Sequence, residues 1–273
     1  MTSLPPPPLP PSIRSRQVDG INGLSMHVLE AGFETKGRPC VLLLHGFPEL
    51  AFSWRKVMPA LAAAGYHVIA PDQRGYGRTS GWSADYDGDL APFRLTNLVR
   101  DALGLVYAFG YRKVHAVVGH DFGSLVAVWC AMIRPDVFRS VVMMSAPFAG
   151  PPSLPFDTVE RPATPQAQDP VYAALAALPR PRKHYQLYYA TRAANVDMHQ
   201  APQGLHQFLR DYYHHKSADW PGNRPCPLRA WSAEELAKLP TYYVMDLHKT
   251  MAETVADVTP DQQQIADVRW LTN

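Results

Sequence analysis

The sequence lacks any long apolar run. None of its hydrophobic stretches approaches the roughly 18 residues that a membrane-spanning helix needs, so we expect no membrane span. It also lacks an excess of either charge. The 26 lysines and arginines and the 24 aspartates and glutamates give a formal net charge of +2. Because these charges are scattered and form no basic stripe, nucleic acid is not expected as a partner.

Cysteine is scarce as well. Cys40, Cys130 and Cys226 lie far apart and show no CxxC spacing. This pattern excludes a disulfide framework and a cysteine zinc site, and it indicates free thiols in a reducing compartment. The amino-terminal segment has no apolar core of the kind that a secretory signal carries. The expected location is therefore the cytoplasm.

Proline, by contrast, is abundant: 27 residues cluster at the start of the chain and again after residue 150. The first twelve residues, MTSLPPPPLPPS, predict an extended, disordered leader, with a ligand for a proline-binding domain as the alternative. The composition and periodicity of the remaining residues suggest two further parts. We predict a leader over residues 1–12, a core over 13–149 and a mainly helical cap over 150–273.

Strand-like and helix-like stretches alternate through the predicted core. Strands are predicted over residues 15–18, 24–31, 41–44, 67–70, 114–118 and 141–144. Helices are predicted over residues 54–64, 93–109 and 122–133. The wholly apolar run 41–44 is typical of a strand buried on both faces. This alternation predicts an α/β fold with a mostly parallel sheet and helices on both faces. Residues 171–268 look mainly helical and aromatic-rich, and no strand is expected there.

One segment carries the chemistry. In VVGHDFGS (117–124), an apolar strand leads into Gly-x-Asp-x-Gly, and a helix follows at once. This is the layout of a nucleophile elbow, with Asp121 in the place where serine is usual. A carboxylate there attacks a saturated carbon and forms an alkyl ester, whereas a serine attacks a carbonyl. The alternative interpretation of Asp121 is an ordinary helix N-cap.

A second segment, HGFPE (45–49), follows the buried strand 41–44. The backbone N–H of Phe47 can join that of Phe122 to form an oxyanion hole, although a plain turn has the same composition. A third segment, PDQRGYG (71–77), is interpreted as a turn held by its Asp and Arg side chains. The residues expected to support the site are His45, Gly46, Pro48, Gly119, His120 and Gly123.

Together, HGFPE, PDQRGYG, GHDFGS and RPDVFRSVVMMSAPF resemble soluble epoxide hydrolases of the α/β-hydrolase superfamily, over about residues 13–272. The resemblance implies an α/β-hydrolase fold with a helical cap inserted after the strand 141–144. It implies Asp121 as nucleophile, Phe47 and Phe122 as oxyanion-hole amides, and Tyr185 of HYQLY as proton donor to the epoxide oxygen. The implied reactants are a small apolar epoxide and water, with a vicinal diol as product. Neither a metal nor an organic cofactor is implied.

The family pattern is incomplete here. A second cap tyrosine, a carboxylate and a histidine base should follow the cap, but QIADVRWLTN (264–273) resembles only the last part of the cap. None of the eleven histidines matches the base, and SAPF (145–148), where some relatives place the acid, has no carboxylate. We therefore expect missing C-terminal strands, an exposed apolar edge at 141–144, and slow or stalled turnover of the ester.

Two other functions fit the same motifs. A haloalkane dehalogenase also uses an elbow aspartate, but the side chains of Phe47 and Phe122 cannot donate a hydrogen bond to a halide. The second alternative is a catalytically inactive homologue that binds an apolar ligand or a partner. The sequence does not identify the epoxide, and it assigns no oligomeric state.

Overall fold

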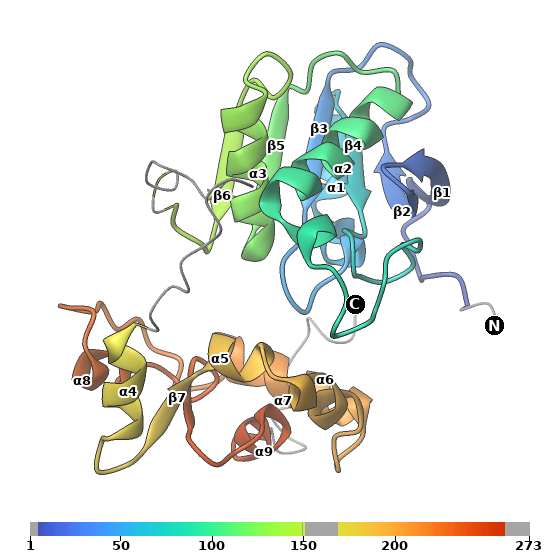
Figure 1. Ribbon diagram of the computed structural model, residues 1–273. Coiled ribbons are helices and arrows are strands. Elements are labelled where there is room, and N and C mark those ends of the chain that lie inside the picture. Colours follow the sequence, from blue (N-terminus) through green and yellow to red (C-terminus); the bar gives the residue numbers. More distant parts are fainter. Residues whose placement is uncertain (1–4, 149, 151–168, 260–273) are drawn as a thin grey trace. The chain divides into compact units, whose positions relative to one another are not determined.

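The chain forms two compact units, Met1–Leu154 and Pro155–Asn273. A computed structural model describes residues 5–148, 150 and 169–259 (Figure 1). The predictions for Ala149, for most of the proline-rich stretch 150–170 and for 264–273 concern residues outside this description.

Unit 1 is built around a six-stranded sheet in the order β1-β2-β4-β3-β5-β6 (Figure 1). The strands are β1 (Ile13–Ile21), β2 (Leu24–Ala31), β3 (Cys40–Leu44), β4 (His67–Pro71), β5 (Ala116–His120) and β6 (Val141–Met144). The last four strands in this spatial order pair in parallel, whereas β1 pairs with β2, and β2 with β4, in antiparallel fashion. The predicted α/β sheet is therefore confirmed.

Helices cover both faces of this sheet. The helical segments are η1 (Ala51–Lys56), α1 (Met58–Ala63), η2 (Ala91–Phe93), α2 (Leu95–Ala108) and α3 (Phe122–Ile133). Alternate side chains of β3 belong to different cores: Leu42 packs with residues of α2 and α3, whereas Leu43 packs with residues of η1 and α1. All five residues of β3 are buried, as the apolar run predicts.

Several predicted boundaries in unit 1 are wrong. The strand predicted over 15–18 is the longer strand β1, and the helix predicted over 93–109 begins two residues later, as α2. The helix predicted over 54–64 is divided into the 3-10 helix η1 and the short helix α1, because Pro59 has no N–H to continue a helix and is accommodated in a first turn. The strand predicted over 114–118 lies two residues later, as β5. Val114 instead forms an isolated bridge with Phe138, and pairing with β3 begins at Ala116.

Residues 5–12 of the predicted leader belong to unit 1 and contact the rest of it. Leu9 packs against the core cluster on the α1 face of the sheet. The Pro5 carbonyl accepts a hydrogen bond from the Arg78 guanidinium, and the Pro10 carbonyl accepts one from the Ile13 N–H at 2.9 Å.

β6 lies at one edge of the described sheet and is unusually exposed for an apolar strand. Val141, Val142 and Met144 are 40%, 46% and 42% exposed. Met132 and Ile133, at the end of α3, are also exposed. An apolar edge strand of this kind is a template for pairing with another chain. The exposed edge expected from the sequence is thus present in the described residues.

Replacing Val142 with lysine is expected to reduce self-association, because a charged side chain on an edge strand opposes edge-to-edge pairing. Val196→Lys is the matched control, since Val196 is 50% exposed on the helix α6 (Arg192–His199). Sedimentation velocity over a concentration series measures the effect. Equal self-association of the two variants would show that β6 is not the surface through which chains associate.

Unit 2 is mainly helical but contains a small sheet. Its elements are α4 (Pro170–Ala176), β7 (Arg182–His184), α5 (Tyr185–Tyr189), α6 (Arg192–His199), α7 (Leu205–Lys216), α8 (Ala233–Leu236), β8 (Val244–Asp246) and α9 (Met251–Ala256). β7 and β8 pair antiparallel, so the expectation of no strand here is wrong. Each strand has three residues, too few for a periodic pattern to reveal it. None of the helices in the described ranges has the length and apolar character that crossing a membrane requires.

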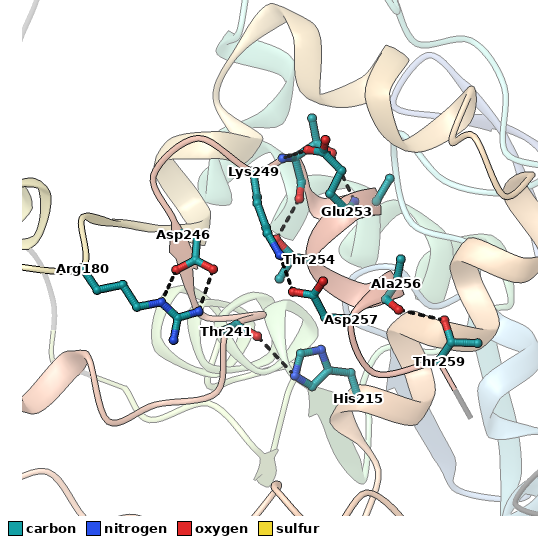
Figure 2. Close-up of polar contacts among 12 residues, drawn as sticks. Arg180, His215, Thr241, Asp246, Lys249, Glu253, Thr254, Ala256, Asp257 and Thr259 are labelled. Carbon is teal, nitrogen blue, oxygen red and sulfur yellow. Dashed lines mark hydrogen bonds and ion pairs between the residues drawn. The ribbon is translucent and has the colours of Figure 1, made fainter. Parts of the chain in front are cut away.

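Polar side chains secure the end of this small sheet and the start of α9. Figure 2 shows Arg180 donating two hydrogen bonds to the Asp246 carboxylate, both at 2.7 Å. Thr250 and Glu253 form a capping box, in which each side chain satisfies the other's backbone N–H. Lys249 pairs with Asp257 at 2.5 Å. Local polar contacts thus define both ends of α9.

The stability of unit 2 is expected to fall as the pH drops from about 6.5 to about 4. Burial, and then the charge of His214, lower the pKa of His215 to about 4, and its Nδ1 has no hydrogen-bond partner in the described part of the chain. In this range the unfolded chain binds a proton at His215 that the folded chain does not bind. Urea unfolding near neutral pH and at pH ~4.5 tests this linkage. His215→Gln should flatten the dependence, and His206→Gln, at an exposed position, should leave it unchanged.

Candidate active site

Asp121 occupies a strained turn between β5 and α3. Its backbone has φ 52° and ψ −123°, a region that is sparsely populated and costs of order 1–3 kcal/mol. A Cβ on Gly119 would lie 2.1 Å from the Gly123 carbonyl oxygen, and a Cβ on Gly123 would lie 2.2 Å from that of Leu44. Both positions therefore require glycine. The turn has the geometry that the Gly-x-Asp-x-Gly spacing predicts.

The Asp121 carboxylate points to the loop after β3 and does not cap its own helix. It makes no N-cap hydrogen bond to α3, whereas the Phe47 N–H donates to its Oδ1 at 3.1 Å. A Cβ on Gly46 would lie 2.4 Å from the Cβ of Asp121, so only glycine permits so close an approach. The helix-cap interpretation of Asp121 is therefore wrong.

The second predicted amide donor, Phe122, is the first residue of α3. N–H groups in the first turn of a helix have no partner within the helix, and that end carries partial positive charge. Parallel pairing of β3 with β5, in the register Leu44↔Gly119, keeps the loop of Phe47 beside the elbow. The arrangement can supply two backbone donors to an oxygen carried on Asp121.

His45 stabilises the loop that carries Phe47 through hydrogen bonds to Gly46 and Gln73. It is 0% exposed, and the Gln73 N–H donates to its Nε2 at 3.1 Å. The proton therefore resides on Nδ1, which lies 2.9 Å from the Gly46 carbonyl oxygen. Burial lowers the pKa of His45 and outweighs the opposing effects of that hydrogen bond and of nearby carboxylates. His45 is thus a neutral structural imidazole with both nitrogens engaged.

Tyr76, from the PDQRGYG loop, is a site residue that the sequence did not single out. Its ring packs edge-on against His45, with 4.9 Å between centroids. Burial, and then the negative charge of Asp121, raise the pKa of Tyr76 to about 12. A neutral phenol therefore lies within the electrostatic reach of the elbow carboxylate.

Glu49 and His120 form a second unanticipated contact beside the elbow. The His120 Nδ1 lies 2.8 Å from Glu49 Oε2, which also accepts the Gly46 N–H at 3.4 Å. Burial raises the pKa of Glu49, but the hydrogen bond and charge of His120 outweigh it and hold this pKa below its usual value. Glu49 is thus ionised, and it joins the oxyanion loop to the residue before Asp121.

The structural interpretation of PDQRGYG is confirmed. Asp72 accepts the backbone N–H groups of Ala51 at 2.9 Å and Arg78 at 3.0 Å. Arg74 donates from Nε and Nη2 to the two carboxylate oxygens of Asp101, at 2.8 and 2.7 Å. The side chains of both Arg74 and Asp101 are only 5% exposed. These contacts hold the loop that carries Tyr76 and Gln73.

Tyr185, the predicted proton donor, begins α5 of unit 2. Its ring lies 5.4 Å from that of Tyr189 and 5.3 Å from that of Tyr243, edge-on in both cases. It is therefore part of an aromatic cluster in its own unit. Within the described residues, no group of three or more His, Cys, Asp or Glu side chains is arranged to hold a metal ion.

Comparison with known proteins agrees with this geometry. A family model for the alpha/beta hydrolase fold matches residues 39–241. The chain belongs to the α/β-hydrolase family. It is 43% identical over 128 residues to epoxide hydrolase B of Mycobacterium tuberculosis, and 40% identical over 138 residues to epoxide hydrolase 3 of Siraitia grosvenorii. These alignments cover 47% and 50% of this chain, but only 34% and 40% of the relatives.

Solved structures extend the similarity. An epoxide hydrolase from an endophytic Streptomyces superposes with a TM-score of 0.65 at 28% identity, covering 90% of this chain and 62% of that one. Epoxide hydrolase A from Mycobacterium thermoresistibile superposes with a TM-score of 0.58, also at 28% identity, covering 90% of this chain and 70% of that one. The chain thus spans about a third of the length of the curated relative it matches at 43% identity, and about two thirds of these structures.

Proposed function

We propose that this protein opens an epoxide by forming an ester on Asp121, with a vicinal diol as the eventual product. The observation that carries the proposal is the carboxylate on the strained turn, with the Phe47 N–H 3.1 Å from its Oδ1. In the first step, a carboxylate oxygen of Asp121 attacks an epoxide carbon and the carbon–oxygen bond breaks. The proposed role of Tyr185 is to donate its phenolic proton to the departing oxygen.

In the second step, water attacks the carbonyl carbon of the Asp121 ester. The proposed stabilisers of the negative charge that develops on the carbonyl oxygen are the amides of Phe47 and Phe122. This assignment is supported by the Phe47 N–H, which donates to Asp121 Oδ1, and by the position of Phe122 as the first residue of α3, directly after Asp121. Collapse of this intermediate breaks the bond between its central carbon and the alcohol oxygen and restores the Asp121 carboxylate. One proton of the attacking water goes to the alcohol oxygen as the diol leaves, and the other returns to the Tyr185 phenol. Activation of the water needs a base, and His45 is not suited to that role, since both of its ring nitrogens are engaged.

Three segments of the chain have different proposed roles. Residues 13–149 form the catalytic core, residues 150–273 form a cap that carries Tyr185, and residues 1–12 are a leader. The proposed substrate is a small apolar epoxide, with water as co-substrate. A cytoplasmic location is supported by Cys40, Cys130 and Cys226, which are all free thiols.

Covalent trapping tests the reaction and separates it from simple ligand binding. The whole chain is incubated with styrene oxide, and the intact mass and peptide map are recorded. One adduct per chain, located on Asp121, is expected. An inactive homologue that only binds an apolar ligand would give no adduct at Asp121, and this result would overturn the proposal.

A further inference from the structure

Ser15, His27 and Asp72 form a hydrogen-bonded series on a part of unit 1 that the proposed epoxide reaction does not use. The Ser15 Oγ lies 2.8 Å from His27 Nε2, and the His27 Nδ1 lies 2.8 Å from Asp72 Oδ2. This is the order of groups and the spacing by which serine hydrolases activate a hydroxyl.

The sheet brings these three residues together from distant positions in the chain. Ser15 lies on β1 and His27 on β2, and the register Gln17↔His27 places the imidazole diagonally beside Ser15 on the same face. Asp72 directly follows β4, which pairs with β2. Strand pairing therefore fixes the relative positions of all three side chains.

Burial divides the three residues in the way that a nucleophile and its base require. Ser15 is exposed, whereas His27 is 6% and Asp72 2% exposed. Burial raises the pKa of Asp72, but the hydrogen bonds from His27 and from two backbone N–H groups outweigh it and keep this pKa below its usual value. An ionised Asp72 can only accept, so it holds the proton on His27 Nδ1. In a neutral imidazole with this tautomer, the Nε2 lone pair is directed at the Ser15 hydroxyl.

A surface cavity of about 370 Å³ lies at Ser15. Its lining residues are Ser15, Arg16, Gln17, His27 and Arg78. The lining thus includes two guanidinium groups: Arg16, which also pairs with Glu30 at 3.5 Å, and Arg78, which also donates to the Pro5 carbonyl oxygen. Guanidinium N–H groups can stabilise an oxyanion, and they favour a substrate with a negative charge.

We propose that Ser15, His27 and Asp72 are a second reactive site, which transfers the acyl group of a small, negatively charged ester to Ser15. The Ser15 Oγ attacks the ester carbonyl carbon, and its proton passes to His27 Nε2. His27 then donates that proton to the departing alcohol oxygen, which leaves an acyl-Ser15. Water attacks this acyl group and gives a proton to His27, which returns it to Ser15 as the carboxylic acid departs.

A fluorophosphonate probe, which phosphonylates activated serines, tests the proposal on the whole chain. One label per chain is expected, and peptide mapping should place it on Ser15, away from Asp121. Ser15→Ala should abolish labelling. His27→Gln should slow it about 100-fold or more, the scale of a lost general base. Ser25→Ala is the matched control, because Ser25 is a hydroxyl on the neighbouring strand β2 whose side chain donates to a carboxylate, Asp19, and which makes no hydrogen bond to a histidine among the described residues. Its rate should equal that of the unmodified chain.

A second measurement is independent of how well the His27 variant folds. Ser15→Cys should react with iodoacetamide at least about tenfold faster than Ser25→Cys at neutral pH, because an adjacent imidazole promotes thiolate formation. 4-Nitrophenyl hemisuccinate should acylate Ser15 faster than 4-nitrophenyl acetate. Absence of label on Ser15, labelling that persists in Ser15→Ala, or equal rates for the two cysteine variants would each show that the series is a purely structural network and would overturn the proposal.

Discussion

Replacement of Asp121 by asparagine is expected to reduce the rate of ester formation with an epoxide by about 10⁴-fold or more, because loss of a nucleophile has an effect of this size. Asparagine has nearly the same size and tolerates a positive φ, so the elbow at φ 52° can remain folded. Its amide, however, does not attack a saturated carbon. The rate of adduct formation with styrene oxide, measured by intact mass, reports the loss.

The matched control for this experiment is Asp89→Asn, since Asp89 is an exposed carboxylate in a loop of the same unit. It should form the adduct at the unchanged rate. Persistence of the adduct in Asp121→Asn would remove the assignment of Asp121 as nucleophile.

The ester itself is expected to be long-lived in this chain. A positioned general base is worth about 10² to 10⁴ in rate, and His45 cannot supply one because its two nitrogens are held by Gln73 and Gly46. A time course after removal of free epoxide measures the decay of the adduct. Rapid multiple turnover to diol would contradict this expectation and would require another base.

Replacement of Asp101 by alanine is expected to destabilise unit 1 by about 3–5 kcal/mol, since it leaves a buried guanidinium without its partner. Arg74 donates two short hydrogen bonds to Asp101, and Asn22 donates a third at 2.6 Å. Hydrogen exchange of the β3 and β5 amides gives the change in unfolding free energy. The loop that carries Tyr76 should also lose protection.

Asp136→Ala is the control for this second experiment. Arg134 and Asp136 form an equally short ion pair, but the Asp136 side chain is 62% exposed, and pairs in water contribute little. A similar loss of stability in both variants would show that burial of the Arg74–Asp101 pair is not the source of its effect.

Asp121 could be predicted as a site residue from the sequence, whereas several of its neighbours could not. The elbow was predictable because its determinants, Gly119 and Gly123, lie within two residues of Asp121 and obey a local steric rule. Tyr76 and Glu49 lie in loops that follow different strands, and the partner of Glu49, His120, ends a third strand, β5. Their approach is determined by strand order, which no local pattern encodes.

The secondary structure likewise includes elements that local sequence patterns predict and elements that tertiary contacts determine. The strand 24–31 was predictable in full, because apolar residues run through it. The helix expected over 54–64 failed where one proline outweighed the helical spacing, and the three-residue strands β7 and β8 were missed because each is stabilised by its partner and not by its own pattern. Local rules thus define the frame of the site, whereas tertiary contacts decide which side chains complete it.

The close approach of Gly123 to the Leu44 carbonyl, and of Gly46 to Asp121, has a consequence for the order of assembly. The Phe47 N–H can donate to Asp121 only when β3 has docked in register against β5, because its loop directly follows β3. A partly folded chain therefore bears an ordinary aspartate at this position, without the backbone donors that confer reactivity. Alkylation of Asp121 would thus serve as a chemical reporter of completed folding, and nascent chains would be spared premature modification.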